Sequence, residues 1–147
     1  MAGLERLLAV REELLKSRVP AVKVQQIFGN VESLLSLHRL LLSDLQSCTC
    51  TTVCSCTAAV FVRYADVFKL YTDFVNNFEK ALAEVAALKA NNSAFQKWSA
   101  QQREPAQLTS LLIAPIQRIP RYMLLLQQLA RHTPVFSNGN GSNAGGR

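Results

Sequence analysis

The sequence has little glycine and proline, with six and five of its 147 residues, and few aromatic residues, which make up 7%. These low contents exclude a collagen-like repeat and a low-complexity disordered chain. Long apolar runs are also missing, because Arg, Lys, Glu or Gln interrupts every Leu-rich segment. The charged first stretch, MAGLERLLAVREELLK, does not have the pattern of a signal peptide. We therefore expect no membrane span and a cytoplasmic protein.

Hydrophobic residues make up 49% of the chain, which at this length supports one domain with its own core. The formal net charge is +6, but the basic residues are scattered, with no Lys/Arg block and no basic stripe interleaved with aromatic residues. Such a charge permits contact with nucleic acid, an acidic membrane or an acidic protein, and selects none of them. Because single-strand binders combine a basic groove with stacking aromatic residues, we expect no nucleic-acid partner.

Apolar residues recur at helical spacing along most of the chain. One stripe runs from Ile27 to Leu45 and another from Phe61 to Val85, in steps of three and four residues. Each stripe predicts one long helix, and an earlier helical stripe ends at Pro20. Sustained stripes of this period favour helices packed side by side. The predicted fold class is all-α, an elongated helical bundle.

All four cysteines lie in one segment, CTCTTVCSCTA, between the second and third predicted helices. Cys48, Cys50, Cys54 and Cys56 have the spacing C-x-C-x3-C-x-C. Thiolates at this density could bind zinc or copper(I), so a thiol metal site is one interpretation. Zinc sites usually have C-x2-C, and we favour a Cys-rich loop insertion over residues 47–57 without a metal. In a reducing compartment its thiols are expected to be free.

The chain lacks the motifs of familiar catalytic chemistry. It has no Ser-His-Asp order with supporting glycines, no G-x-x-x-x-G-K-[ST] and no H-E-x-x-H. The carboxylates stand at helical spacing, which is typical of solvated helix faces. His38 lies on an apolar stripe, so a half-buried histidine with hydrogen-bond partners is expected there rather than a ligand. We predict no catalytic residue, no metal and no cofactor.

A dense helical signal covers the segment from Leu111 to His132. Pro115 suits the start of a helix, and Pro120 predicts a local kink inside it. One face of this helix would carry Gln117, Arg121, Leu124 and Gln128. The opposite face, which can enter the core, would carry Ile119, Tyr122, Leu126 and Leu129. Taken alone, the first face has two interpretations, a solvated surface and a binding surface.

The run LLIAPIQRIPRYMLLLQQLARHTP resembles the third conserved region of the Dbl homology domain, the module of Rho-family guanine nucleotide exchange factors. The pattern of that region is L-L-I-K-P-x-Q-R-I-x-[KR]-Y-x-L-L-L-x-x-L, and the sequence departs from it at Ala114, where lysine is common. The run IFGNVESLLSLHRLLLSDL resembles the end of the first region and the helix beyond, and VFVRYADVFKLYTDFVNNFEKAL resembles the second region. The chain is identified as a partial Dbl homology domain over residues 1–134, followed by a disordered Ser/Asn/Gly tail over residues 135–147.

The resemblance implies a helical surface that binds a Rho-family small GTPase and promotes GDP release by remodelling the GTPase switch regions. No covalent chemistry is involved, so the chain would not be an enzyme in that sense. The resemblance assigns Gln117, Arg121 and Leu124 to GTPase binding, with Arg121 meeting switch two. It implies structural roles for Arg118 and Tyr122. Membrane contact would be indirect, through the GTPase or a neighbouring domain.

Two features of the family pattern are not found in the chain. The family has a glutamate that engages switch one, and Glu5 stands too close to Phe28 to match it. A further helix with an interfacial asparagine would follow Pro134, where the sequence instead becomes rich in Ser, Asn and Gly. We therefore expect a domain incomplete at both ends, with weak or absent exchange activity by itself. The alternative is a non-catalytic helical GTPase-binding or scaffold module.

Overall fold

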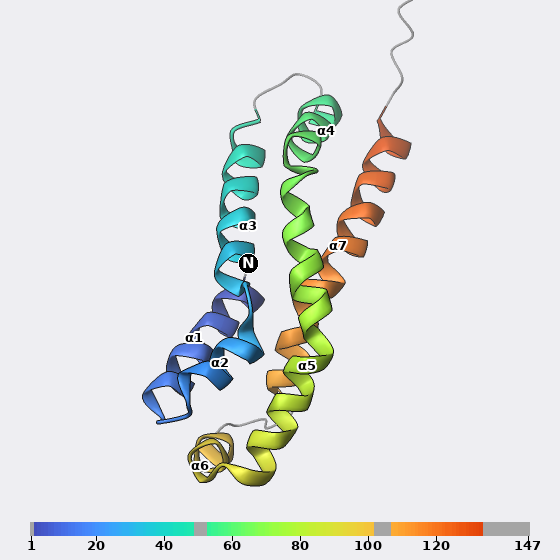
Figure 1. Cartoon of the computed structure of the whole chain (residues 1–147). Helices are drawn as coiled ribbons and strands as arrows, with labels where there is room; N and C mark the ends of the chain where they lie inside the picture. Colours follow the sequence, from blue (N-terminus) through green and yellow to red (C-terminus); the bar gives the residue numbers. More distant parts are fainter. Residues whose placement is uncertain (1, 49–52, 102–106, 134–147) are drawn as a thin grey trace, which may run out of the picture.

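The computed structural model describes residues 2–48, 53–101 and 107–133, and every element in these ranges is helical. In chain order the elements are α1 (Ala2–Lys16), α2 (Ala21–Phe28), α3 (Val31–Gln46), α4 (Val53–Tyr64), the 3-10 turn η1 (Val67–Lys69), α5 (Leu70–Asn91), α6 (Ser93–Gln101) and α7 (Gln107–His132). Figure 1 shows them in an elongated bundle, with α3, α5 and α7 along its length and α6 at one end. The predicted all-α class is confirmed. The predicted tail 135–147 lies outside the described residues.

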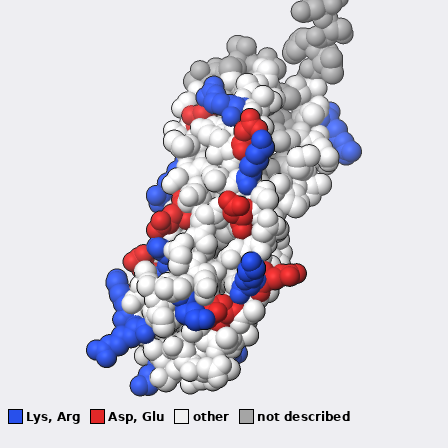
Figure 2. Space-filling view, viewed as in Figure 1, with Lys and Arg blue, Asp and Glu red and all other residues white. Residues whose placement is uncertain are grey.

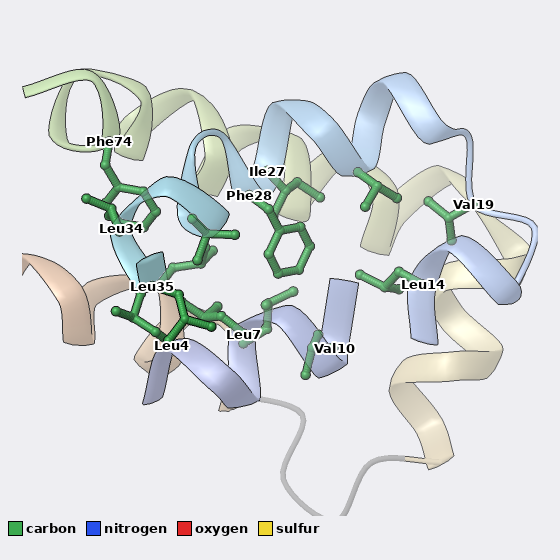
Figure 3. Packing of buried hydrophobic residues seen from close by; sticks show 14 of the residues in the cluster. Leu4, Leu7, Val10, Leu14, Val19, Ile27, Phe28, Leu34, Leu35 and Phe74 are labelled. Carbon is green, nitrogen blue, oxygen red and sulfur yellow. The ribbon is translucent and has the colours of Figure 1, made fainter. Parts of the chain in front are cut away.

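The core lies where α1, α2, α3 and α5 meet the first half of α7 (Figure 3). Leu7 and Leu14 of α1, Phe28 of α2 and Leu34 of α3 are fully buried, and Leu112 of α7 is almost so. Each such side chain contributes on the order of 2 kcal/mol by leaving water. No helix in the described part of the chain is long and apolar enough to cross a membrane.

The predicted helix from Ile27 to Leu45 is broken at Gly29, so the single-helix prediction is wrong there. Gly29 has φ +52°, a conformation that glycine adopts without strain and other residues avoid. Side-chain amides from both sides hold the break, because Asn30 donates to the carbonyl of Leu70 at 2.8 Å and Asn77 to that of Gln26 at 2.7 Å. The chain therefore changes direction between α2 and α3 while both keep their apolar faces on α5.

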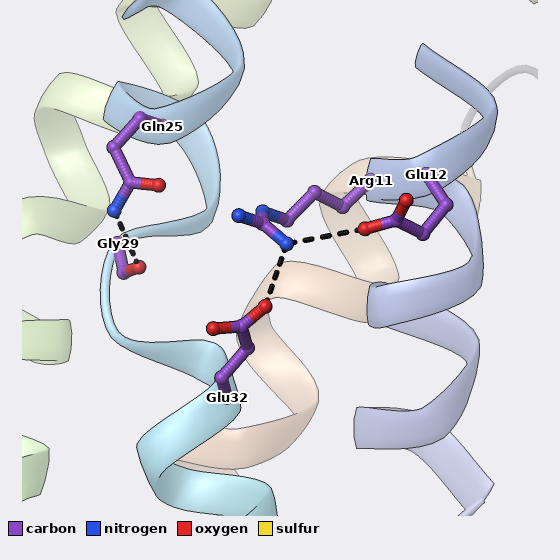
Figure 4. Close-up of polar contacts among 5 residues, drawn as sticks. All are labelled: Arg11, Glu12, Gln25, Gly29 and Glu32. Carbon is purple, nitrogen blue, oxygen red and sulfur yellow. Dashed lines mark hydrogen bonds and ion pairs between the residues drawn. The ribbon is translucent and has the colours of Figure 1, made fainter. Parts of the chain in front are cut away.

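An ion pair and an amide contact lie close to this break (Figure 4). Arg11 of α1 reaches across to Glu32 in the first turn of α3, with Nη1 and Oε1 2.7 Å apart. The same guanidinium contacts Glu12, and Gln25 donates to the carbonyl of Gly29 at 3.1 Å. Because the Glu32 side chain is 65% exposed, solvent screens the ion pair. The pair therefore contributes little to the free energy of unfolding, and its main effect is on the orientation of α1 relative to α3.

The second long predicted helix, Phe61 to Val85, is also broken. The α4 helix ends at Tyr64, and a 3-10 turn leads into α5 at Leu70. No glycine or proline marks this break in the sequence. Tertiary packing accounts for it, because the turn brings the ring of Phe68 parallel to that of Phe61, with 6.3 Å between their centroids.

The cysteine segment differs from its prediction in two ways. Of the loop predicted over residues 47–57, the part from Val53 onward belongs to α4. Residues 49–52, which include one of the four cysteines, lie outside the described residues. Cys48 is a free thiol, whereas Cys56 is disulfide-bonded, so the expectation of free thiols is wrong for Cys56. The preference for a plain connection over a thiol metal site stays a prediction.

Candidate functional site

The α7 helix carries the predicted site, and the core fixes its first half. It begins at Gln107, so the prediction that Pro115 starts the helix is wrong. The earlier start follows from packing, because Leu108 and Leu112 are 5% and 1% exposed and belong to the core cluster. The helix also runs close to α1, since a Cβ built on Gly3 would lie 3.8 Å from the Cβ of Ala114. Both Pro115 and Pro120 thus lie inside one 26-residue helix.

The three residues predicted to bind a GTPase lie together on the solvent face of the second half of α7. Gln117, Arg121 and Leu124 are all exposed, and Leu124 is exposed at 60%. Two further apolar side chains flank Leu124, since Met123 is 57% and Leu125 65% exposed. Leu124 and Leu125 lie within about 60° of Arg121 around the helix axis, whereas Met123 points toward α4. An exposed cation beside two exposed apolar side chains is a surface suited to a protein partner. The predicted exposure of this face is confirmed, and the role of its residues stays a prediction.

The predicted inward face of α7 is also found, but its side chains are less deeply buried than those of the core. Its members are half-buried rather than fully buried, and they are Ile119, Tyr122, Leu126 and Leu129. Ile119, Tyr122 and Leu126 lie toward α4, and Tyr122 also reaches His38 in α3. The second half of α7 runs beside α4 (Figure 1). The second half of α7 is therefore attached to the bundle along one side only.

A chain of polar contacts ties this part of α7 to two other helices. Arg118 donates from Nε to the phenolic oxygen of Tyr122 at 2.8 Å, and its guanidinium carbon lies 5.1 Å from the Tyr122 ring centroid. The same phenolic oxygen lies 2.9 Å from Nδ1 of His38 on α3. The other ring nitrogen of His38 lies 2.6 Å from the hydroxyl of Tyr71 on α5. Both nitrogens of His38 are thus hydrogen-bonded.

His38 is more deeply buried than its position on the stripe predicted, with 3% of its surface exposed. Burial and the nearby positive charge of Arg118 lower the pKa of His38 to about 4, so the imidazole is neutral at neutral pH. Burial likewise raises the pKa of Tyr71 well above its usual value. The contacts between these side chains are therefore hydrogen bonds between neutral groups, with Arg118 as the cation at the solvent end.

Aromatic rings enclose this polar chain. The Tyr122 ring packs edge-on against Phe61 at 5.3 Å between centroids and lies 6.1 Å from Phe68. Sequence reasoning missed this cluster, although it placed each of its rings on a helical stripe. The signal that could have revealed it is a histidine on an apolar stripe, which needs buried hydrogen-bond partners from elsewhere in the chain.

Beside the rings, an apolar hollow of about 310 Å³ opens between α4 and α7. Its lining consists of Phe61, Val62, Ala65, Phe68, Ile119, Tyr122, Met123 and Leu126. On α7 the hollow is lined by Ile119, Tyr122, Met123 and Leu126, on the side of the helix that faces α4. It therefore lies on the opposite side of α7 from Gln117, Arg121 and Leu124.

On the face shown in Figure 2, acidic and basic side chains are interspersed. Several are paired, as in Lys23 with Glu84 at 2.9 Å and Arg63 with Asp44 at 2.8 Å. Within the described ranges Arg121 makes no ion pair, so its guanidinium keeps its donors for a partner.

Comparison with known proteins gives consistent matches. The RhoGEF domain model matches residues 4–141. The Rac guanine nucleotide exchange factor JJ of Dictyostelium discoideum is 32% identical over 114 residues, which cover 76% of this chain and 10% of that protein. Pleckstrin homology domain-containing family G member 3 of Homo sapiens is 35% identical over 120 residues, which cover 80% of this chain and 10% of that protein. Rho guanine nucleotide exchange factor 17 of Mus musculus is 32% identical over 119 residues, which cover 76% of this chain and 6% of that protein. The chain spans about a tenth or less of the length of these relatives.

Proposed function

This chain belongs to the RhoGEF (Dbl homology) domain family, and we propose that it binds a Rho-family small GTPase through α7 and promotes the release of GDP. The observation that carries the proposal is the exposed stripe of Gln117, Arg121 and Leu124. Among the described residues the Arg121 guanidinium makes no ion pair, and it lies beside exposed apolar side chains. The names of two of the relatives support the partner class, since they refer to guanine nucleotide exchange on Rac or Rho. No covalent step is needed.

The proposed activity is differential binding. A surface that binds the nucleotide-free GTPase more tightly than the GDP-bound form lowers the affinity for GDP by the same factor. Arg121 would supply donors to a carboxylate or carbonyl in switch two, and Gln117 would supply a carboxamide one helical turn away. Leu124 would bury its exposed surface against the partner. These contacts would remodel the switch regions and loosen GDP.

The proposal is tested by binding and by exchange, measured with the same proteins. Affinity for nucleotide-free and GDP-bound forms of a panel of Rho-family GTPases is measured, and release of fluorescent GDP is followed. We expect tighter binding to the nucleotide-free form of at least one GTPase, with GDP release accelerated only weakly by this chain. Arg121→Glu should weaken this binding by roughly tenfold or more, because it reverses a charge at the interface. Lys80→Glu, an equal charge reversal at an exposed site on α5, is the matched control.

Each other outcome has a definite meaning. Equal affinity for the two nucleotide states, with no effect on GDP release, would identify the chain as a non-catalytic GTPase-binding or scaffold module. Absence of binding to every GTPase would overturn the proposal. Equal loss of affinity in Arg121→Glu and Lys80→Glu would show that the interface does not lie on α7.

A further inference from the structure

The backbone of α7 is weakened at the point where the helix leaves the core. Proline has no N–H, so Pro115 cannot donate to the carbonyl of Leu111, nor Pro120 to that of Ile116. Two hydrogen bonds of the helix are therefore missing within about one and a half turns. Before this stretch α7 is fixed by buried Leu108 and Leu112, and beyond it the inward side chains are only half-buried. The direction of the second half is thus not set by the backbone alone.

The polar chain begins inside this weakened stretch. Arg118 lies between Pro115 and Pro120, and it is joined to Tyr122 one turn later by a hydrogen bond and a cation–π contact. Tyr122 then contacts His38, and His38 contacts Tyr71. One side chain of α7 is therefore anchored on α3 and, through α3, on α5. These are the helices that the core already holds rigidly.

The anchored residues and the proposed binding residues alternate along α7. Arg118 directly follows Gln117, and Tyr122 directly follows Arg121. In a helix, a side chain lies about 100° around the axis from its neighbour in sequence. Fixing the rotation of Tyr122 about the helix axis therefore fixes the direction in which Arg121 points. The same holds for Arg118 and Gln117.

We propose that His38 and Tyr122 are positioning residues for the binding surface, which hold the second half of α7 in the rotation that presents Arg121 and Leu124 to the GTPase. The inference rests on the proposed function, because the two residues are proposed to position the surface that binds the GTPase. Neither residue touches the partner, and both act through the orientation of α7. Their hydrogen bond spans 84 residues of sequence and joins α3 to α7.

The first experiment removes the hydroxyl and keeps the ring. Tyr122→Phe preserves the ring contacts with Phe61 and Phe68 and deletes the hydrogen bonds with Arg118 and His38. Tyr64→Phe is the matched control, because it deletes one hydroxyl contact, to Asp44 at 3.0 Å, on another helix. We expect Tyr122→Phe to weaken binding to the nucleotide-free GTPase by roughly tenfold, the scale of effect that misplaced functional groups produce. Tyr64→Phe should bind with the original affinity, and equal affinities in the two variants would overturn the proposal.

The second experiment separates positioning from stability by rescue. His38→Asn places a carboxamide at the same number of bonds from the backbone as Nδ1, so it keeps a partner for Tyr122. His38→Leu has similar bulk and offers none. Both variants lose the contact with Tyr71, and both should melt at a lower temperature. We expect His38→Asn to retain most of the affinity for the nucleotide-free GTPase and His38→Leu to lose it. Affinities that simply follow the melting temperature would show a merely structural role and overturn the proposal.

A third readout does not need a GTPase. Amide hydrogen exchange followed by mass spectrometry reports the opening of each helix. We expect Tyr122→Phe to lose protection in the second half of α7 and to keep it in α1, whereas Tyr64→Phe should keep both. If the original chain binds no GTPase, the proposed function fails while this readout still measures the anchoring. If the chain is active and α7 is equally protected in both variants, the positioning inference alone fails.

Discussion

The phenolic oxygen of Tyr122 lies 2.9 Å from Nδ1 of His38, although 84 residues separate the two in the chain. The contact joins the helix that carries the candidate surface to the helix that runs through the core. Its His38 end is buried, with 3% of the residue exposed, whereas Tyr122 is half-buried, so water has only limited access to the contact. Movement of α7 that broke this hydrogen bond would leave a polar group without a partner, which costs free energy. The contact therefore restricts the positions that α7 can take.

The buried imidazole makes stability depend on pH. In the folded chain the pKa of His38 is lowered to about 4, whereas in the unfolded chain it returns to about 6.5. The unfolded state then binds more protons between these values, so the stability is fully present above pH 6.5 and is lost as pH falls toward 4. The loss attributable to His38 is on the order of 3 kcal/mol. Urea unfolding at a series of pH values measures it.

His38→Asn is the control for this pH dependence. It has no titrating side chain at position 38, and the other titrating groups are common to both chains. The difference between the two free energies of unfolding should therefore vary with pH only between about 6.5 and 4. A difference that stays constant over this range would contradict the burial of a neutral histidine.

The break at Gly29 gives a second prediction. Gly29→Ala must place a side chain at φ +52°, and its Cβ would meet Nδ2 of Asn77 at 3.4 Å. We expect a loss of about 1–2 kcal/mol in the free energy of unfolding. Gly3→Ala is the control, because Gly3 lies in α1 and its Cβ would meet Ala114 at an ordinary contact distance of 3.8 Å. It should be neutral or slightly stabilising, and equal losses in the two variants would contradict the strained position at residue 29.

The start of α6 depends on one side chain. The carboxamide oxygen of Asn92 accepts a hydrogen bond from the backbone N–H of Phe95 at 2.8 Å, which satisfies one of the free donors of the first turn. Asn92→Ala should lower the free energy of unfolding by about 1 kcal/mol. Asn91→Ala, at the exposed last residue of α5, should change it little, and chemical unfolding of both variants compares them. A larger loss in Asn91→Ala would refute the capping role.

The fold class and the faces of α7 could be predicted from the sequence because both follow from local periodicity. The stripe that makes residues 108–132 amphipathic decides which side chains face outward, whatever the rest of the chain does. The exposure of Gln117, Arg121 and Leu124 was therefore within reach of sequence reasoning. Their role in binding is a separate matter, since exposure is a property of the helix and binding is a property of a complex.

The helix breaks could not be predicted in the same way, because the groups that hold them lie far away in sequence. Apolar spacing continues across Gly29, and the bonds that hold the turn come from Asn30 to residue 70 and from Asn77 to residue 26. Pro115 shows the reverse case. Its local preference for the first turn of a helix was overridden, because Leu108 and Leu112 gain more by packing in the core than two helical hydrogen bonds cost.

Leu112 and Leu124 are the same residue type on one helix, twelve positions apart, and they separate stability from the proposed binding. Leu112 is 1% exposed in the core, and Leu124 is 60% exposed on the candidate surface. Leu112→Ala should therefore cost about 2–5 kcal/mol of unfolding free energy, through lost burial and the cavity left behind. Leu124→Ala should leave the free energy of unfolding within about 0.5 kcal/mol of the original value. Urea unfolding followed by circular dichroism gives both numbers.

The same two variants then bear on binding to a Rho-family GTPase. Under conditions where Leu112→Ala is still folded, its affinity should match that of the original chain, because Leu112 does not reach the surface. Leu124→Ala should bind at least roughly fivefold more weakly, since an exposed apolar side chain that becomes buried in an interface contributes on the order of 1–2 kcal/mol. Full affinity in Leu124→Ala, together with full stability, would show that Leu124 is an ordinary exposed leucine and that the interface lies elsewhere on the bundle.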